Sequence, residues 1–405
     1  SKLSATLLAL ILGASVFMAG QVWAAKYVTD PTTGKVVSAP QYGGTLTYPY
    51  VLAGENSDPF VVGGSAVFLI GGVNENLARP NWGLAREEFA FNGPYVPLFA
   101  FTGELAESWE TPDPLTYVFH MRQGVHFALD PDSEASRLVG GRELTADDVV
   151  YTYQRNTAQG DFTERPTVTR AAVDLPWESI EASDKYTVVM KLTEPNLGAL
   201  GAIINEGLHW ILPREVIEQY GDYKDWKNVV GTGPVMLTDY VEGVSKTWTK
   251  NPDYWGFDEK YPENRLPYAD QIRVLIMPEV ATMLSAVRTG KVDRGYTLRT
   301  IDQVESLQRT NPELLIWPIY GRADYMFGMD NINPPFDDIR VRKAMQMALN
   351  LEEINSAYFG GYADMIPQGL LNRLMTEVVF QFEEWPEDVK KVFDYDPEGA
   401  EALLD

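Results

Sequence analysis

The sequence predicts an α/β fold, because apolar strands and helical patterns follow one another along the chain. An apolar stretch at 272–277 leads directly into a helical pattern at 280–289, which ends before Gly290. Alternation of apolar and polar side chains marks further strands at 117–122 and 186–192. A strand that leads into a helix in this way favours helices packed against a sheet.

The remaining elements are marked by turn and capping residues. Turn-rich sequence precedes a short strand pattern at 45–48. Thr145 and Asp148 have the spacing of a helix capping box, and another helix is predicted at 338–348. A last helix begins in the segment 397–405 and has no stop signal, so we expect the chain to end inside an element.

Length and composition limit the possible functions. The chain has 405 residues, which at roughly 150 residues per domain indicates two or three domains. Its 57 acidic and 33 basic side chains give a net charge of −24, which disfavours binding to nucleic acid. Cysteine is absent and only three histidines occur, so disulfides, thiolate metal sites and most histidine-based catalysis are not expected.

No motif for catalysis or phosphate binding survives inspection. Walker loops, nucleophile elbows and paired metalloprotease histidines are missing, and Gly-Thr-Gly at 231–233 lacks the third glycine of a dinucleotide loop. Acidic residues at 130–134 have calcium-loop spacing, but Ala135 replaces the required glycine, and a solvated acidic turn is the alternative. His120 and His126 could form a metal pair across a hairpin, although ordinary hairpin histidines have the same pattern. We therefore predict no enzyme, no catalytic residue, no metal and no cofactor.

The first residues have the features of an export signal. Lys2 precedes an apolar run at 3–20, and small residues at Val22 and Ala24 then suit a signal peptidase that cuts between Ala24 and Ala25. We expect cleavage between these two alanines, which removes residues 1–24. A retained membrane anchor is the alternative, because an apolar run of this length could nearly span a bilayer.

A series of short signatures lies in a fixed order along most of the chain. Among them are Gly-Thr-Gly-Pro at 231–234 and Asn-Pro-Asp-Tyr-Trp at 251–255. The glycines of the first can hold a tight turn and allow close backbone approach. We expect the second to be a structural turn with a buried Trp255. Further signatures are at 103–109, 115–127, 141–151, 286–293 and 334–344.

In this order the signatures resemble the large extracytoplasmic solute-binding proteins of ABC importers, in the peptide/nickel family of dipeptide- and oligopeptide-binding proteins. The resemblance runs from about Gly44 to Asp405. It implies a fold like that of type II periplasmic binding proteins, with two α/β lobes joined by a hinge and an extra α/β domain on the first lobe. Members of this family continue further along the second lobe, so we expect this chain to be C-terminally truncated.

The same resemblance suggests domain limits. By analogy, lobe I consists of residues 25–65 and 170–270, and the extra domain of residues 66–169. Lobe II then extends over 271–405. The first crossing between the lobes is expected at 267–277.

In lobe I, the resemblance places the end of the first strand at the ligand cleft. Tyr48 and Tyr50 lie there and are candidate aromatic walls. Thr232 and Gly233 are candidates because their turn allows close backbone approach, and a purely structural turn is the alternative. The family more often has tyrosine directly after Pro234, where this chain has valine, so an aromatic contact at that position is not supported.

In lobe II, the candidate ligand residues precede the turn at Pro334. A carboxylate there could bind the ammonium group of a peptide, and tyrosines could line the cleft. The alternative is that these residues belong to a core strand. The candidates are Tyr320, Asp324, Tyr325 and Asp330.

The resemblance implies capture of a solute outside the cytoplasmic membrane and its delivery to an ABC permease, whose ATPase acts through that permease. We expect a periplasmic monomer that binds peptides, with nickel complexes, sugars or opines as alternative solutes, because the family reuses one scaffold. A solute sensor or chemoreceptor ligand-binding protein of the same fold is a second hypothesis. A secreted hydrolase is a third, and no motif favours it.

Overall fold

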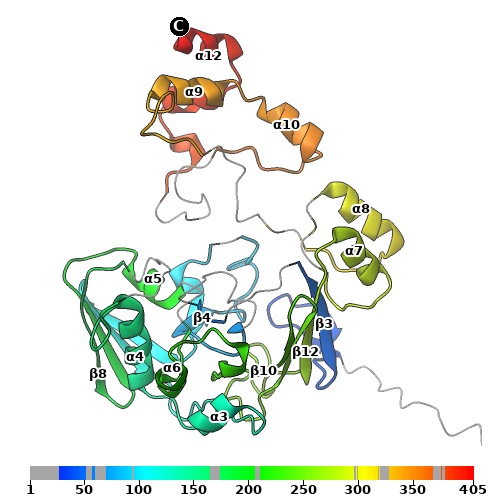
Figure 1. Ribbon diagram of the computed structural model, residues 1–405. Helices are drawn as coiled ribbons and strands as arrows, with labels where there is room; N and C mark the ends of the chain where they lie inside the picture. Colours follow the sequence, from blue (N-terminus) through cyan, green and yellow to red (C-terminus); the bar gives the residue numbers. More distant parts are fainter. Residues whose placement is uncertain are drawn as a thin grey trace, which may run out of the picture.

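The computed structural model has two four-stranded sheets and a set of surrounding helices (Figure 1). The predicted signal peptide, 1–24, and its cleavage site lie outside the described residues. The structure describes residues 27–51, 57–59, 70–93, 95–164, 174–205, 210–295, 298, 300–317, 319, 328–367, 375 and 379–405.

The first sheet has the strand order β10-β11-β12-β3. Its strands are β3 (Thr45–Tyr50), β10 (Val235–Val241), β11 (Ser245–Lys250) and β12 (Gln271–Ile276). The three strands late in the sequence pair in antiparallel fashion, whereas β12 and β3 pair in parallel. The strands predicted at 45–48 and 272–277 are therefore confirmed, and they are direct neighbours.

The second sheet is fully antiparallel, with the order β6-β7-β9-β8. It contains β6 (Ala106–Asp113), β7 (Thr116–Met121), β8 (Trp177–Asp184) and β9 (Thr187–Leu192). In β7 and β9 every second side chain is buried, as the alternating pattern predicts for a sheet with one covered face.

Short elements accompany the two sheets. The strands β1 (Tyr27–Thr29) and β2 (Val36–Ser38) form one small sheet, and β4 (Ala78–Pro80) and β5 (Phe101–Gly103) form another. The helix predicted after Thr145 is α4, and it packs against β8 and β9 of the second sheet. The helical segments of this part are η2 (Leu98–Ala100), α3 (Glu134–Val139), α4 (Ala146–Thr157), α5 (Ala199–Asn205), α6 (Arg214–Tyr220) and η3 (Trp226–Asn228).

In the rest of the chain, the regular elements that the structure describes are helices. Figure 1 shows α7 and α8 beside the ends of β3 and β12, whereas α9, α10 and α12 lie away from both sheets. Asp396 N donates to Met347 O (2.9 Å), which joins α12 to α9. The helices predicted at 280–289, at 338–348 and from Pro397 are confirmed. The elements are α7 (Val280–Arg288), α8 (Ile301–Thr310), α9 (Ile339–Met347), α10 (Leu351–Tyr358), η4 (Phe382–Glu384), α11 (Glu387–Lys390), η5 (Lys391–Phe393) and α12 (Pro397–Leu404).

One cluster of buried apolar side chains extends across both large sheets. Phe119 and Val188 contribute from the second sheet, and Trp248 and Val274 contribute from the first. Burial of apolar surface is the main favourable term in folding, so this shared core holds the two sheets together.

Two predicted domain limits fall inside this arrangement. The limit between residues 169 and 170 separates β8 and β9 from β6 and β7, although all four strands pair in one sheet. The limit between residues 270 and 271 separates β12 from β3, which pair directly. Strand pairing joins residues that are distant in sequence, so domain limits placed along the sequence by analogy do not take it into account. The assignment of lobes stays a prediction.

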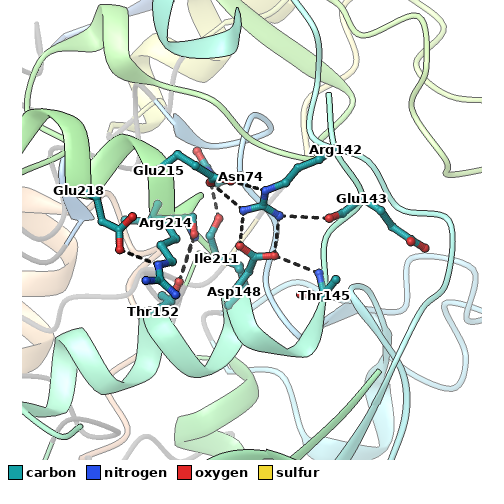
Figure 2. A network of polar contacts seen from close by, with 11 residues as sticks. Asn74, Arg142, Glu143, Thr145, Asp148, Thr152, Ile211, Arg214, Glu215 and Glu218 are labelled. Carbon is teal, nitrogen blue, oxygen red and sulfur yellow. Dashed lines mark hydrogen bonds and ion pairs between the residues drawn. The ribbon is translucent and has the colours of Figure 1, made fainter. Parts of the chain in front are cut away.

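Arg142 links the turn before α4 to two helices (Figure 2). Its guanidinium donates to both carboxylate oxygens of Asp148 on α4, at 2.9 and 2.6 Å, and to Glu215 on α6, at 2.7 Å from Nη2 to Oε2. Asp148 also accepts from Thr145 N (3.0 Å), which is the capping interaction predicted for this helix. The side chain of Asp148 is only 4% exposed, so these hydrogen bonds replace the contacts with water that its carboxylate lacks.

We expect Arg142→Met to lower the free energy of unfolding by roughly 2 kcal/mol, because it leaves the buried carboxylate of Asp148 without its cation. Chemical denaturation of the variant measures this. Arg214→Met is the matched control, since the Arg214–Glu218 pair in Figure 2 is exposed and such pairs contribute about 0.5 kcal/mol. Equal losses in the two variants would contradict the structural role given to Arg142.

Candidate functional site

The carboxyl end of β3 carries the first pair of predicted ligand residues. Tyr48 and Tyr50 are half-buried and pack against the apolar core. Tyr48 is paired with Val274 of β12, which is paired with Lys246 of β11, so these three side chains lie on the same face of the sheet. The two tyrosines are therefore core-facing side chains with part of their surface accessible, and their contact with ligand stays a prediction.

Arg294 lies against Tyr48. Its guanidinium carbon is 5.9 Å from the centre of the Tyr48 ring. The backbone just before it is fixed to β3, because Asp293 N donates to Thr47 O (2.7 Å) and the Asp293 carboxylate accepts from Thr47 N (2.7 Å). Burial raises the pKa of Tyr48, and the charge of Arg294 acts in the opposite direction. Sequence analysis missed Arg294, which comes one residue after the signature at 286–293.

The Gly-Thr-Gly turn packs against another part of the same chain. A Cβ atom at Gly231 would overlap the backbone oxygen of Val73, and one at Gly233 would overlap that of Gly72. Gly233 N donates to Val73 O (2.8 Å), and Thr232 is 2% exposed. The close backbone approach that the glycines predicted is thus made to residues 72 and 73. These contacts support the structural alternative, and ligand contact by Thr232 and Gly233 stays a prediction.

The two turn signatures meet at Asn251. Its side-chain amide donates to Gly233 O (2.9 Å), and its backbone N donates to Pro234 O (2.8 Å). Tyr254 is the fully buried aromatic side chain of this turn, whereas Trp255 is half-buried. The turn is therefore structural, as expected, but its buried aromatic residue is the tyrosine rather than the tryptophan.

A buried carboxylate lies beneath this turn. Glu75 is 3% exposed and accepts hydrogen bonds from the Tyr254 hydroxyl and from Trp255 Nε1, both at 3.0 Å. The hydroxyl of Thr232 also hydrogen-bonds to it. Burial raises the pKa of Glu75 in spite of these hydrogen bonds and of the nearby positive charge of Arg79. The sequence pattern does not single out this glutamate.

A second carboxyl group adds to this cluster. Glu104 accepts from Asn76 N (2.8 Å), and its pKa is raised well above the usual value, first by burial and then by the charge of Glu75. Arg79 forms an ion pair with Glu259 (2.9 Å). In the described part of the chain, no group of acidic or histidine side chains has the arrangement of a metal site. The cluster thus consists of hydrogen-bonded carboxyl groups that connect the segments around Glu75, Glu104 and Tyr254.

An aromatic loop between β4 and η2 was also missed. Trp82 and Phe91 lie with ring centres 4.7 Å apart, and Phe89 packs edge-on against both Phe91 and Phe99. Arg86 lies over the Phe91 ring at 4.9 Å. Trp82 and Phe99 are 52% and 64% exposed. The density of aromatic residues in this stretch is a signal that sequence analysis could have used.

Of the ligand residues predicted in lobe II, Asp330 alone belongs to the described part of the chain, since Tyr320, Asp324 and Tyr325 lie outside it. Asp330 is exposed, and its carboxylate accepts from the Asn333 side-chain amide (2.6 Å) and from Ile332 N (3.0 Å). These hydrogen bonds lower its pKa. Asp330 therefore stabilises a local turn in this structure, and a ligand role for it stays a prediction.

The two hairpin histidines and the acidic turn at 130–134 have local partners. His120 contacts Glu110 (2.7 Å), and His126 contacts Gly141 O (2.9 Å), which is how ordinary hairpin histidines behave. Asp130 accepts from Asp132 N (2.9 Å) within its own turn. The helices that the structure describes include none with the length and apolarity needed to cross a membrane.

Comparison with known families gives one match that covers most of the chain. The family described as "Bacterial extracellular solute-binding proteins, family 5 Middle" matches residues 100–405, and the chain belongs to this family. The family predicted from the order of the signatures is therefore confirmed.

Two individual relatives have less than 30% sequence identity with this chain. The periplasmic oligopeptide-binding protein of Salmonella typhimurium is 25% identical over 267 residues, which are 62% of this chain and 45% of the relative. Di/tripeptide-binding protein 2 of Pseudomonas aeruginosa is 28% identical over 316 residues, which are 74% of this chain and 54% of the relative. The chain thus spans about half the length of these relatives.

A solved structure shows the same fold. The ABC transporter-associated periplasmic binding protein DppA of Helicobacter pylori, in complex with the peptide STSA, aligns with a TM-score of 0.64 and 22% identity. The alignment covers 90% of this chain and 66% of that one. The predicted fold class, α/β and similar to type II periplasmic binding proteins, is confirmed by this likeness.

The raised pKa values of Glu75 and Glu104 predict that stability falls as the pH rises. The usual value is 4.5, so above this pH the folded protein binds more protons than the unfolded chain does, up to the folded pKa. We expect Glu104→Gln to make this fall in the free energy of unfolding smaller. Denaturation in urea at several pH values above 4.5 measures it, with Glu107→Gln, an exposed glutamate on β6, as control. An unchanged slope in Glu104→Gln would contradict the raised pKa.

The packing of the Gly-Thr-Gly turn predicts a loss of stability for Gly233→Ala. The new methyl group would overlap Gly72 O, and overpacking of this kind destabilises by roughly 1–3 kcal/mol. Gly201→Ala is the control, because a Cβ there meets Leu98 at an ordinary 3.9 Å and alanine favours helix α5. A Gly233→Ala variant of normal stability that lost only ligand affinity would favour the ligand role instead.

Proposed function

Because the chain belongs to the bacterial extracellular solute-binding proteins of family 5, we propose that it is the solute-binding component of an ABC importer and that it captures peptides. The family match over residues 100–405 is the observation that carries this proposal. The relatives named as oligopeptide- and di/tripeptide-binding proteins support peptides as the solute class.

The residues of the candidate site have the chemistry that this function requires. An extended peptide offers backbone donors and acceptors, side chains and two charged termini. The half-buried rings of Tyr48 and Tyr50 could contact its side chains, and the predicted lobes could close over it. The full set of proposed ligand residues remains Tyr48, Tyr50, Thr232, Gly233, Tyr320, Asp324, Tyr325 and Asp330.

The remaining parts of the proposal concern partners and location. Members of the family are binding proteins, and we propose that this chain likewise performs no chemical step, with ATP hydrolysed by a subunit associated with the permease. The Salmonella relative is named as a periplasmic protein, so we propose export of this chain, cleavage of its signal segment between Ala24 and Ala25, and action as a periplasmic monomer.

Peptides are expected to raise the thermal unfolding temperature of the protein, because a ligand that binds only the folded state stabilises it by about 2.7 kcal/mol at one hundred times its Kd. A panel of di- to pentapeptides tests this by thermal unfolding, with the corresponding free amino acids as control. Mass spectrometry of the incubated peptides adds a second readout. Intact peptides with a raised unfolding temperature are expected, whereas released fragments or no shift with any peptide would contradict the proposal.

A further inference from the structure

The connection between β4 and β5, residues 81–100, forms a closed loop rich in aromatic side chains. Its ends are fixed, because Pro80 pairs with Phe101 and Asn81 N donates to Ala100 O (2.8 Å). The aromatic rings of the loop pack on one another and are not part of the buried core cluster. Ordered connections longer than about 15 residues are uncommon in compact domains and are usually functional.

Asn92 and Gly93 lie in this loop and form the one Asn-Gly pair of the sequence. Both residues are half-buried, and neither takes part in a hydrogen bond within the described part of the chain. Phe91, directly before them, has a φ of 51°, a left-handed conformation that bulky residues rarely adopt. The backbone therefore bends just before an asparagine whose side chain no described residue restrains.

An asparagine that precedes glycine can react with its own backbone. The amide nitrogen of Gly93 attacks Cγ of Asn92, which forms a new C–N bond and closes a succinimide ring. The bond from Cγ to the side-chain nitrogen breaks, and ammonia leaves with the proton that the backbone nitrogen loses. Water then opens the ring at either carbonyl, which gives aspartate or isoaspartate. Glycine favours the attack, because it has no Cβ to hinder the approach and adopts many backbone conformations.

Asn355 shows how the structure protects an asparagine from this reaction. It precedes another small residue, Ser356, but it is buried in α10. Its side-chain amide donates to Ala363 O (3.2 Å), and its side-chain oxygen accepts from Ala363 N (2.9 Å). Paired amides are held by their hydrogen bonds, so this side chain cannot turn toward its own backbone. Asn92 has no such restraint from the residues that the structure describes.

We propose that Asn92 is a site of spontaneous deamidation, which converts the aromatic loop into a more acidic form. Arg86 gives this form a specific consequence. Its guanidinium carbon is 4.9 Å from the centre of the Phe91 ring, and it forms no ion pair with any described residue. A carboxylate introduced directly after Phe91 attracts this cation. Isoaspartate also lengthens the main chain, which displaces the rings packed around Phe91. The inference concerns this loop and does not depend on the proposed solute.

The test follows the asparagines of the purified full chain over time. The protein is incubated at neutral and at mildly alkaline pH, and peptide mapping by mass spectrometry quantifies aspartate and isoaspartate at each position. We expect Asn92 to be converted while Asn355 stays intact. Conversion should be faster at alkaline pH, because the attacking nitrogen must lose its proton. The rate in the folded protein should approach the rate in the urea-unfolded chain.

Two variants separate the reaction from its consequence. Gly93→Ala keeps Asn92 but adds a Cβ beside the attacking nitrogen, so conversion should be severalfold slower. Asn92→Asp has the charge of the product from the start. We expect it to cost less thermal stability in the unmodified background than in Arg86→Gln, where the cation is missing. Thermal unfolding also shows whether Gly93→Ala is folded.

The possible results decide between reaction and protection at Asn92. An asparagine at position 92 that survives as long as Asn355 does would overturn the proposal. Equal rates in the unmodified protein and in Gly93→Ala would also overturn it, because the backbone attack would not determine the rate. Conversion in urea alone would show that the folded loop protects this residue. An equal effect of Asn92→Asp with and without Arg86 would overturn the consequence assigned to that arginine.

Discussion

The parallel pairing of β3 with β12 is the contact on which the candidate site depends. It joins residues 45–50 to residues 271–276, so the chain between them forms one long connection that begins and ends in the same sheet. Parallel neighbours require such a crossover connection, and here the crossover contains the whole second sheet. The pairing also leaves Tyr48 beside the chain that continues past β12, which is how Asp293 and Arg294 reach β3.

A second constraint is the close approach of the segment around Asn74 to the glycine turn. The side-chain amide of Asn74 donates to Ile211 O and to Val230 O, both at 3.1 Å, so one amide satisfies two separate backbone segments. Its neighbour Glu75 accepts from Tyr254 and Trp255. Buried polar groups must be paired to be tolerated, so these two side chains specify how four distant segments pack. The Gly-Thr-Gly-Pro turn is therefore positioned by the buried hydrogen bonds of Asn74 and Glu75.

The sequence could predict the parts of this arrangement that depend on neighbouring residues. The strand at 45–48, the helix after Thr145 and the helix from Pro397 are all encoded by local spacing, and each is present. The partner of the glycine turn was not predictable, because Gly72 and Val73 are far away in sequence and have no special pattern. The same holds for Arg294, because nothing in the local sequence indicates that this arginine lies against the ring of Tyr48. The domain limits stay a prediction, and two of them separate strands that pair with each other, because strand pairing joins residues that are distant in sequence.

Ionisable side chains buried near the first sheet lower the stability of this fold at neutral pH. Lys246 of β11 is fully buried on the face that also carries Tyr48, and burial lowers its pKa to about 8 from 10.5. A shift of this size lowers the free energy of unfolding by roughly 3 kcal/mol below pH 8. The loss disappears as the pH rises above 10.5, which is the pKa of the unfolded chain's lysine. For Glu75 and Glu104 the sign is opposite, because their raised pKa values add instability as the pH rises from 4.5. Between pH 4.5 and pH 8, the burial of Lys246 and the burial of the two glutamates both lower the free energy of unfolding. The shared apolar core has to offset this loss at the pH where the protein is expected to work.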